Sequence, residues 1–290
     1  MAQAGSPVLF LYFYRKCMQI MTGSEQPIGL FDSGVGGLTV AHAISSMLPN
    51  EQLIYYGDTA HLPYGDKSKE TIVGYSVGIA DFLMEHGCKV ILIACNSASA
   101  NAYREVQEHV GNRAVVLNVL DPVVEYVSKD PDAAHVGVIG TKATIQSMSY
   151  QDAILERDPS RTVSTLATPL FVPMIEEGFV FDDISNAIIR SYLSRRELND
   201  IDTLILGCTH YPIIRNQISR YYNFGVNVVD SARIVAEFLQ QYLQSHDLLA
   251  TKRGGANAYF VSDHTPSFET IANMFFNEKI HLEKQSIWNR

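Results

Sequence analysis

The chain contains short runs of apolar and β-branched residues, each of which ends in small or polar residues. Two of these runs share one layout, because Val90–Ala94 leads directly to Cys95 and Thr203–Gly207 leads directly to Cys208. Such runs are typical of buried strands in a parallel sheet, and open α/β sheets bind ligands at the carboxyl ends of their strands. The pattern therefore predicts two thiols, from two halves of the chain, that face each other across one ligand.

Apolar runs alternate with segments of helical spacing in the first half of the chain. Strands separated by helices require right-handed crossovers, and they predict a mainly parallel sheet with helices on both faces. A tight, glycine-rich turn follows the first run. The expected strands are 27–32, 53–56, 90–94 and 114–120, and the expected helices are 38–48, 69–86 and a helix after residue 95.

The same alternation restarts after Asp121-Pro122. We expect a loop over 171–178, and the acidic pair Glu176-Glu177 in it is interpreted as solvated surface. We expect Ser231 to cap the last long helix. The expected strands are 135–140, 163–168, 203–207, 226–230 and 258–262, and the expected helices are 182–196 and 231–244.

The order of these features repeats along the chain. Asp32 follows the first strand and Thr141 follows another strand 109 residues later, while Cys95 and Cys208 are 113 residues apart. This spacing indicates an internal duplication. It predicts an α/β fold of two similar domains, each with a mainly parallel sheet flanked by helices, and an active site in the cleft between them. We place the first domain at 27–121 with 226–290 packing back on it, the second domain at 122–225, and an extension outside the fold at 1–26.

Composition narrows the classes of function. With 47% hydrophobic and 18% charged residues, the chain has the composition of a globular protein. Its net charge of −9 argues against a nucleic-acid partner. No apolar run approaches the ~20 residues that a membrane span requires. We therefore expect a small-molecule substrate, with no nucleic acid and no membrane as partners.

The four cysteines, Cys17, Cys88, Cys95 and Cys208, form no CxxC pair and no cluster with histidines. We therefore expect neither a metal site nor a disulfide framework. This use of cysteine indicates a reducing compartment, so we expect a cytoplasmic protein. Cys17 and Cys88 are interpreted as small apolar residues.

A single cysteine after an apolar run is usually a buried small residue as well. Two cysteines in equivalent places, each followed by polar residues, favour a reactive pair instead. Both should lie at the amino end of a helix, where the dipole and the free amides favour a thiolate. Asp32 and His210 are candidates to exchange protons with the thiols, although Asp32 would also suit a helix cap and His210 a core position.

Polar residues that follow the strands are suited to hold a carboxylate or an amino group. Their hydroxyl, amide and backbone groups could form a cradle around a small ligand. Asp58 is interpreted as a brace for its own loop. The chain has neither a GxGxxG pattern nor a Walker lysine, so nucleotide binding is not favoured. The cradle residues are Ser33, Tyr64, Gly65, Asn96, Ser97 and Thr209.

Three blocks of the sequence resemble the signature blocks of bacterial glutamate racemases, within the aspartate/glutamate racemase family. The blocks are Phe31–Val40, Ala94–Ala98 and Gly207–Pro212, and Pro63–Gly65 resembles a fourth. The resemblance extends in order from about residue 27 to about residue 242. Ser97 departs from the threonine expected after Cys-Asn, but it keeps the hydroxyl group.

The resemblance implies an enzyme that interconverts L- and D-glutamate without a cofactor or a metal and supplies D-glutamate for peptidoglycan. Cys95 and Cys208 would be the catalytic thiols of a two-base proton transfer, one on each face of the substrate. Asp32 and His210 would tune the thiols, and together with the cradle residues they match substrate-contacting positions of the family. The family also suggests a homodimer. A racemase for another acidic amino acid such as aspartate, and a non-catalytic module that binds a small molecule, are the alternatives.

Overall fold

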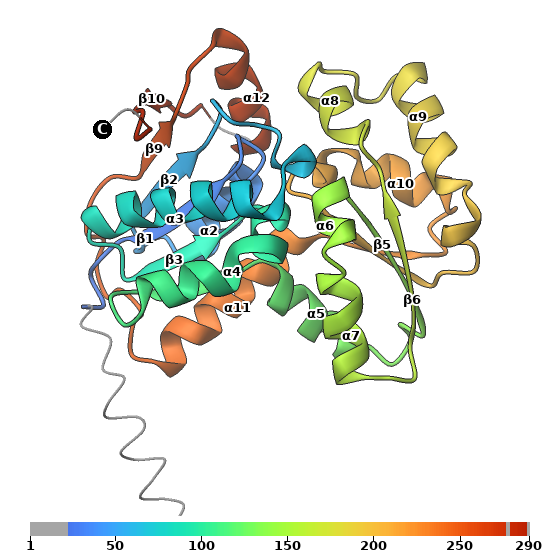
Figure 1. Cartoon of the computed structure of the whole chain (residues 1–290), viewed down its shortest axis with the longest axis horizontal. Coiled ribbons are helices and arrows are strands. Elements are labelled where there is room, and N and C mark those ends of the chain that lie inside the picture. The colour runs from blue at the N-terminus through green and yellow to red at the C-terminus, as the bar shows by residue number, and fades with distance from the viewer. Residues whose placement is uncertain (1–22, 277–278, 289–290) are drawn as a thin grey trace, which may run out of the picture.

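Two parallel sheets form the framework of the computed structural model, which describes residues 23–276 and 279–288. Figure 1 shows them in two lobes, and the chain returns to the first lobe at its C-terminal end. The first lobe holds β1 (Ile28–Asp32), β2 (Leu53–Gly57), β3 (Val90–Ile93), β4 (Val115–Asn118), β9 (Ala258–Val261) and β10 (Glu283–Lys284). The second lobe holds β5 (His135–Gly140), β6 (Thr162–Ala167), β7 (Thr203–Gly207) and β8 (Asn227–Val229).

The two sheets repeat one strand order. The first sheet runs β10-β9-β2-β1-β3-β4 and the second runs β6-β5-β7-β8, with every pairing parallel. The order β2-β1-β3-β4 in the first lobe therefore matches β6-β5-β7-β8 in the second. This arrangement is the α/β architecture expected from the duplication, and it places β3 and β7, which precede the two cysteines, in equivalent positions.

Helices cover both faces of the sheets (Figure 1). Those of the first lobe are α2 (Leu38–Met47), α3 (Lys69–Glu85), α4 (Asn96–Val110), α11 (Ser231–Ser245) and α12 (Pro266–Phe276), and α5 (Leu120–Lys129) leads into the second lobe. The second lobe has α6 (Lys142–Gln146), α7 (Ser149–Arg157), α8 (Phe171–Glu176), α9 (Asp183–Leu193) and α10 (Arg215–Tyr221). Short 3₁₀ helices are η1 (Tyr64–Asp66), η2 (Arg196–Leu198) and η3 (Tyr211–Ile214).

Alternating side chains on the central strands explain why both faces are covered. Leu30 on β1 belongs to one buried cluster with Leu38 of α2 and Leu239 of α11. Its neighbour Phe31 belongs to another with Ile72 of α3, because adjacent residues of a strand point to opposite faces. Burial of one such side chain contributes about 1.5–3 kcal/mol to folding.

The C-terminal part of the chain divides between the two lobes. β9 and β10 extend the first sheet beside β2, and α11 packs against α2. β8 instead pairs with β7. The expectation that everything after residue 226 packs on the first lobe is therefore wrong for 227–229.

The loop expected over 171–178 is wrong, because the helix α8 occupies most of it. Phe171, Met174 and Ile175 are buried along one face of this helix, at the i, i+3, i+4 spacing of a helical pattern. Pro173 lies in the first turn, where the missing N–H is tolerated. The helix carries Glu176 as its last residue.

The ends of several elements depend on polar side chains. Asp230, not Ser231, caps α11, because its carboxylate accepts the N–H of Ala232 at 3.0 Å. The strand expected to continue to residue 120 ends at Asn118, whose Oδ1 accepts the N–H of Leu120 at 2.8 Å and starts the unexpected helix α5. The helix α12 was not expected either.

Residues 23–26, expected to lie outside the fold, pack against the first lobe. The ammonium group of Lys89, at the start of β3, donates to the carbonyl of Ser24. The rest of the expected extension, 1–22 with Cys17, lies outside the described residues. Within the described ranges, no helix combines the length and the apolar character that crossing a membrane requires.

Candidate active site

Cys95 lies at the carboxyl end of β3 and is the N-cap residue of α4. Its side chain is almost fully buried, and its Sγ donates to Ser33 Oγ at 3.6 Å. Burial and the nearby carboxylate of Asp32 raise the pKa of Cys95 to about 12. The backbone N–H of Ala98 at the helix terminus does favour the thiolate, as expected, but burial outweighs it and Cys95 is a thiol.

Cys208 lies at the carboxyl end of β7, in the position equivalent to Cys95. We expected Cys208 to lie at the amino end of an α-helix, and this expectation is wrong. A short 3₁₀ helix over Tyr211–Ile214 comes next, and α10 starts only at Arg215. The imidazole of His210 lies beside the thiol, with its Nδ1 3.8 Å from Cys208 Sγ. A side chain two residues away thus takes the place of a helix terminus beside this thiol.

His210 is held between the thiol and a carboxylate. Its Nε2 lies 3.0 Å from Oε1 of Glu176, the last residue of α8. Burial disfavours the imidazolium, but hydrogen bonds to Cys208 and Glu176 outweigh burial and raise the pKa of His210 to about 10. The interpretation of Glu176 as solvated surface is wrong, whereas its neighbour Glu177 is exposed.

Asp32 connects the two lobes. Its fully buried carboxylate accepts the N–H of Gly34 at 3.1 Å and the hydroxyl of Thr209, from the second lobe, at 3.4 Å. Burial raises the pKa of Asp32, and the charge of His210 opposes this shift. The N-cap of α2 is Gly37, without a side-chain cap, so Asp32 is not a simple cap of the next helix.

The polar residues after Cys95 also reach the second lobe. Asn96 Oδ1 accepts the hydroxyl of Tyr150 at 2.7 Å, while its buried Nδ2 has no hydrogen-bond partner among the described residues. Ser97 Oγ lies 2.8 Å from Thr141 Oγ1 and 3.3 Å from Thr144 Oγ1. The amide of Asn96 is therefore a buried donor that remains available to a ligand.

The loop before α3 closes another side of the site. Tyr64 donates its hydroxyl to the buried carboxylate of Asp58 at 2.6 Å, which confirms Asp58 as a brace for this loop. A Cβ atom on Gly65 would lie 2.6 Å from Thr141 Cβ. The absence of a side chain at Gly65 therefore allows the loop to approach the second lobe.

These groups surround one small cavity that both thiols line. The free space in it is ≈ 20 Å³, about that of a single water molecule. Asp32 does not line the cavity itself, but it accepts hydrogen bonds from Gly34 and Thr209, which do. All the other residues predicted from the sequence line the cavity: Ser33, Tyr64, Gly65, Cys95, Asn96, Ser97, Cys208, Thr209 and His210.

Comparison with known proteins decides the family. The sequence model of the Asp/Glu/Hydantoin racemase family matches residues 37–239. The chain belongs to this family. It is similar to the glutamate racemase of Geobacter metallireducens, with 42% identity over 254 residues that cover 87% of this chain and 93% of that protein. The protein is therefore a racemase, an isomerase.

Solved structures of racemases share the two-lobed fold. Glutamate racemase from Francisella tularensis, in complex with D-glutamate, superposes with a TM-score of 0.86 at 39% identity and covers 92% of this chain and 100% of that one. The enzyme from Thermus thermophilus, in complex with β-chloro-D-alanine, gives a TM-score of 0.81 at 34% identity, with 91% and 98% covered. The expected fold class is confirmed.

Several residues of the racemase cavity were not among the predicted site residues. Thr141 directly follows β5 in the second lobe, just as Ser33 directly follows β1 in the first. The internal repeat could therefore have indicated Thr141. Glu176 carries no local signal, because only the packing of α8 brings it to His210. The residues missed are Gly34, Leu62, Pro63, Thr141, Val172 and Glu176.

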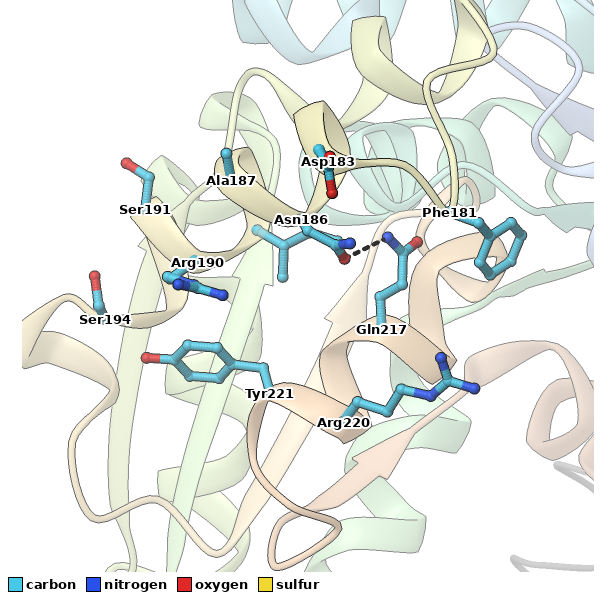
Figure 2. Close-up of a pocket in the computed structure, with 11 residues that line it drawn as sticks. Phe181, Asp183, Asn186, Ala187, Arg190, Ser191, Ser194, Gln217, Arg220 and Tyr221 are labelled. Carbon is cyan, nitrogen blue, oxygen red and sulfur yellow. Dashed lines mark hydrogen bonds between the residues drawn. The ribbon is translucent and has the colours of Figure 1, made fainter.

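The racemase also has a much wider cavity, of ≈ 810 Å³, between α9 and α10 (Figure 2). Arg190 and Arg220 line it, and Gln217 Nε2 donates to Asn186 Oδ1 at 2.9 Å across it. None of the residues predicted from the strand ends lines this cavity, and it contains no thiol. The candidate active site is thus distinguished by its chemistry and not by its volume.

Metal-binding side chains do not gather in the described part of the racemase. Among these residues, no group of three or more His, Cys, Asp or Glu side chains is placed to hold a metal ion. The acidic and imidazole groups at the candidate site instead contact thiols, hydroxyls and one another.

Proposed function

We propose that this racemase interconverts L- and D-glutamate without a cofactor, by proton transfer between Cys95 and Cys208. The observation that carries the proposal is the presence of two thiols at equivalent strand ends that line one cavity. The similar proteins named glutamate racemase support glutamate as the substrate. The D-isomer would supply peptidoglycan synthesis in the cytoplasm, where thiols stay reduced, and the protein would act as a homodimer.

The reaction exchanges one proton on each face of the α-carbon. The thiolate of one cysteine takes the α-proton and becomes a thiol, while the thiol of the other gives its proton to the opposite face and becomes a thiolate. The carbon is inverted and no atom is gained or lost. Which cysteine acts as the base depends on the enantiomer bound, so the enzyme must exist in two protonation states of the pair.

The two sulfurs have different charged neighbours. His210 is an imidazolium at neutral pH, and it would stabilise negative charge on Cys208 at 3.8 Å. Cys95 is a thiol beside Asp32. An imidazolium beside Cys208 suits this cysteine to act as the base in one direction of the reaction, with Cys95 as the acid.

The polar cradle would stabilise the charge that develops on the substrate. Removal of an α-proton moves negative charge toward the carboxylate, and preorganised donors stabilise it most strongly in a site without water. The unpartnered Nδ2 of Asn96 is one such donor, and the hydroxyls of Ser33 and Thr209 line the same cavity. Once the lobes have closed, these groups surround the substrate before the proton is transferred.

Glutamate does not fit in the closed cavity. A free space of ≈ 20 Å³ holds about one water molecule. Because the walls come from both lobes, the substrate would enter when the lobes separate, and their closure would exclude water from the proton transfer.

Circular dichroism of L-glutamate incubated with the purified protein tests the proposal. The signal should decay to that of the racemic mixture with no added cofactor, and the rate should survive dialysis against EDTA in the presence of a thiol reductant. A constant signal from folded protein contradicts racemisation of glutamate. A rate that is lost on chelation and restored by a metal contradicts the thiol mechanism.

A further inference from the structure

The loop from Asp58 to Asp66 forms one wall of the candidate site, through Leu62, Pro63, Tyr64 and Gly65. Apart from the short 3₁₀ helix η1, it has no regular structure to fix its shape. Its conformation depends instead on the carboxylate of Asp58, which is completely buried.

Asp58 accepts hydrogen bonds from three separate parts of the chain. Within the loop, the hydroxyl of Tyr64 donates at 2.6 Å and Nδ1 of His61 at 3.0 Å. The hydroxyl of Ser262, which follows β9, donates at 2.8 Å, and the indole Nε1–H of Trp288 donates at 2.9 Å. A buried carboxylate needs this many donors, so loss of one partner leaves it underpaired.

Trp288 packs closely against the helix α3 and the loop 58–66. Its indole ring packs edge-on against His61 at 4.9 Å and Tyr75 at 5.3 Å between ring centroids. A Cβ atom on Gly78 of α3 would lie 2.9 Å from the indole Cζ3. The lack of a side chain at Gly78 thus makes room for Trp288, and the ring is docked in one orientation.

Residues 282–288 form a C-terminal strap that delivers Trp288 to the loop. β10 pairs with β9, and the N–H of Gln285 donates to the carbonyl of Val261 at 2.8 Å. The hydroxyl of Tyr56 donates to the carbonyl of Gln285 at 3.0 Å. Leu282 is buried. The strap is therefore fixed to the sheet at several points before it reaches Asp58.

We propose that Trp288 is a positioning residue of the active site, which acts through Asp58 and Tyr64 to hold the loop 58–66 against the substrate. Trp288 itself does not line the cavity. It fixes one oxygen of the carboxylate whose other oxygen fixes the hydroxyl of Tyr64. The inference rests on the proposed function only in taking glutamate as the substrate that the loop covers.

The variants Trp288→Phe, Tyr64→Phe and the double variant test this role in the full-length protein. Trp288→Phe keeps an aromatic ring but removes the indole donor, so KM for glutamate should rise by about three- to tenfold, with a smaller change in kcat. Because both residues act on Asp58, their effects should not multiply. The KM of the double variant should lie close to the higher of the two single-variant KM values. Lys284→Ala is the matched control, since it removes the exposed ion pair with Asp263 from the same strap and should leave KM unchanged.

Backbone hydrogen exchange gives a readout that does not depend on activity. In Trp288→Phe, the amides of His61 and Lys67, which are bonded within the loop, should exchange faster, while the amides of β1 should not change. Wild-type KM and unchanged loop exchange in this variant overturn the proposal. The proposal is also overturned if the KM increases of Trp288→Phe and Tyr64→Phe multiply in the double variant, or if amide exchange rises equally in the loop and in β1. Either result would mean that Trp288 stabilises the fold in general.

These readouts separate the two proposals. If the wild-type protein fails to racemise glutamate, the proposed function is wrong, and faster loop exchange in Trp288→Phe still supports the role of the strap. If the wild type is active and both readouts of Trp288→Phe match it, the proposed function stands and the strap has no positioning role.

Discussion

Cys88 and Cys95 show that burial alone does not distinguish a reactive thiol. Both are buried, and burial raises the pKa of each to about 12. Cys88 lies close to Gly29 and Leu83 in an apolar cluster, which agrees with its interpretation as a small apolar residue. Cys95 differs through Ser33 and Asp32, so its neighbours define its chemistry.

Replacement of either cysteine tests the two-base mechanism. Cys95→Ser and Cys208→Ser should each lower racemisation by about 10³-fold or more, because a serine hydroxyl is too weak an acid to replace a thiol in proton transfer. The decay of the circular dichroism signal measures this effect. Cys88→Ala, which removes a thiol outside the site, should retain near-wild-type kcat. A largely active Cys95 or Cys208 variant would show that one base suffices.

The same variants distinguish the two faces of the substrate. With a β-chloro analogue of the substrate, the remaining thiolate can take the α-proton from one enantiomer while chloride leaves. Cys95→Ser and Cys208→Ser should prefer opposite enantiomers, which chloride release measures for each. If both variants prefer the same enantiomer, the thiols do not flank the substrate.

Glu176 should control the alkaline limit of activity. The pKa of His210 is raised from 6.5 to about 10, so the stabilisation from its imidazolium is complete below pH ~6.5 and is lost as the pH rises through about 10. Glu176→Gln removes part of this stabilisation, and kcat/KM should begin to fall at a lower pH than in the wild type. Profiles of kcat/KM against pH test this, with the exposed neighbour Glu177→Gln as control. Coincident profiles for Glu176→Gln and the wild type would rule out this role.

At the scale of elements, the turn between β1 and α2 sets how closely the lobes approach. A Cβ atom on Gly36 would lie 2.4 Å from His210 Nδ1 and 2.6 Å from Thr209 Oγ1. The hydroxyl of Thr39 also donates to the carbonyl of Thr209 at 3.3 Å. The turn therefore packs directly against the segment that carries His210, and a side chain at Gly36 would overlap with it.

Gly36→Ala should displace that segment and disturb the site from a distance. We expect kcat/KM to fall by about tenfold or more, because His210 must move from its place beside Cys208. Gly74→Ala is a matched control: Gly74 is exposed within α3 with nothing near its Cβ position, so this change should raise stability by about 0.5–1 kcal/mol and leave kcat/KM unchanged. Steady-state kinetics and thermal denaturation measure both. Equal kinetics in the two variants would mean that the turn yields to the extra methyl group.

At the scale of the whole molecule, the site exists only where the two lobes meet. Asp32 to Thr209 and Ser97 to Thr141 are hydrogen bonds between lobes, and they surround the cavity. A ligand that adds further contacts to both lobes should stabilise the folded protein as a unit.

D-Glutamate should therefore raise the temperature of unfolding. A ligand that binds only the folded state adds about 2.7 kcal/mol at one hundred times its Kd, which corresponds to several degrees in a chain of this size. Thermal denaturation monitored by far-UV circular dichroism measures the shift. D-Alanine, which lacks the second carboxylate, should have a much smaller effect at the same concentration. An equal shift with both ligands would argue against recognition of an acidic side chain.

The sequence alone determined where most of the strands lie along the chain and which residues follow them. These features are local: an apolar run marks a buried strand, and the next residues must lie at its end whatever the rest of the chain does. Cys95, Cys208 and their polar neighbours were predictable for this reason. The helix α8 was not predicted, although its buried residues have helical spacing, and a segment of six residues that contains a proline is also compatible with a loop.

Only the tertiary structure decided which distant groups meet and which charges they carry. Glu176 reaches His210 from 34 residues away, and Trp288 reaches Asp58 from 230 residues away. No local pattern encodes such contacts, since they depend on how the lobes and the C-terminal strap pack. Protonation follows the same rule: the pKa of Cys95 depends on how deeply the fold buries its sulfur and on the carboxylate of Asp32, and neither can be read from the residues beside it in the chain.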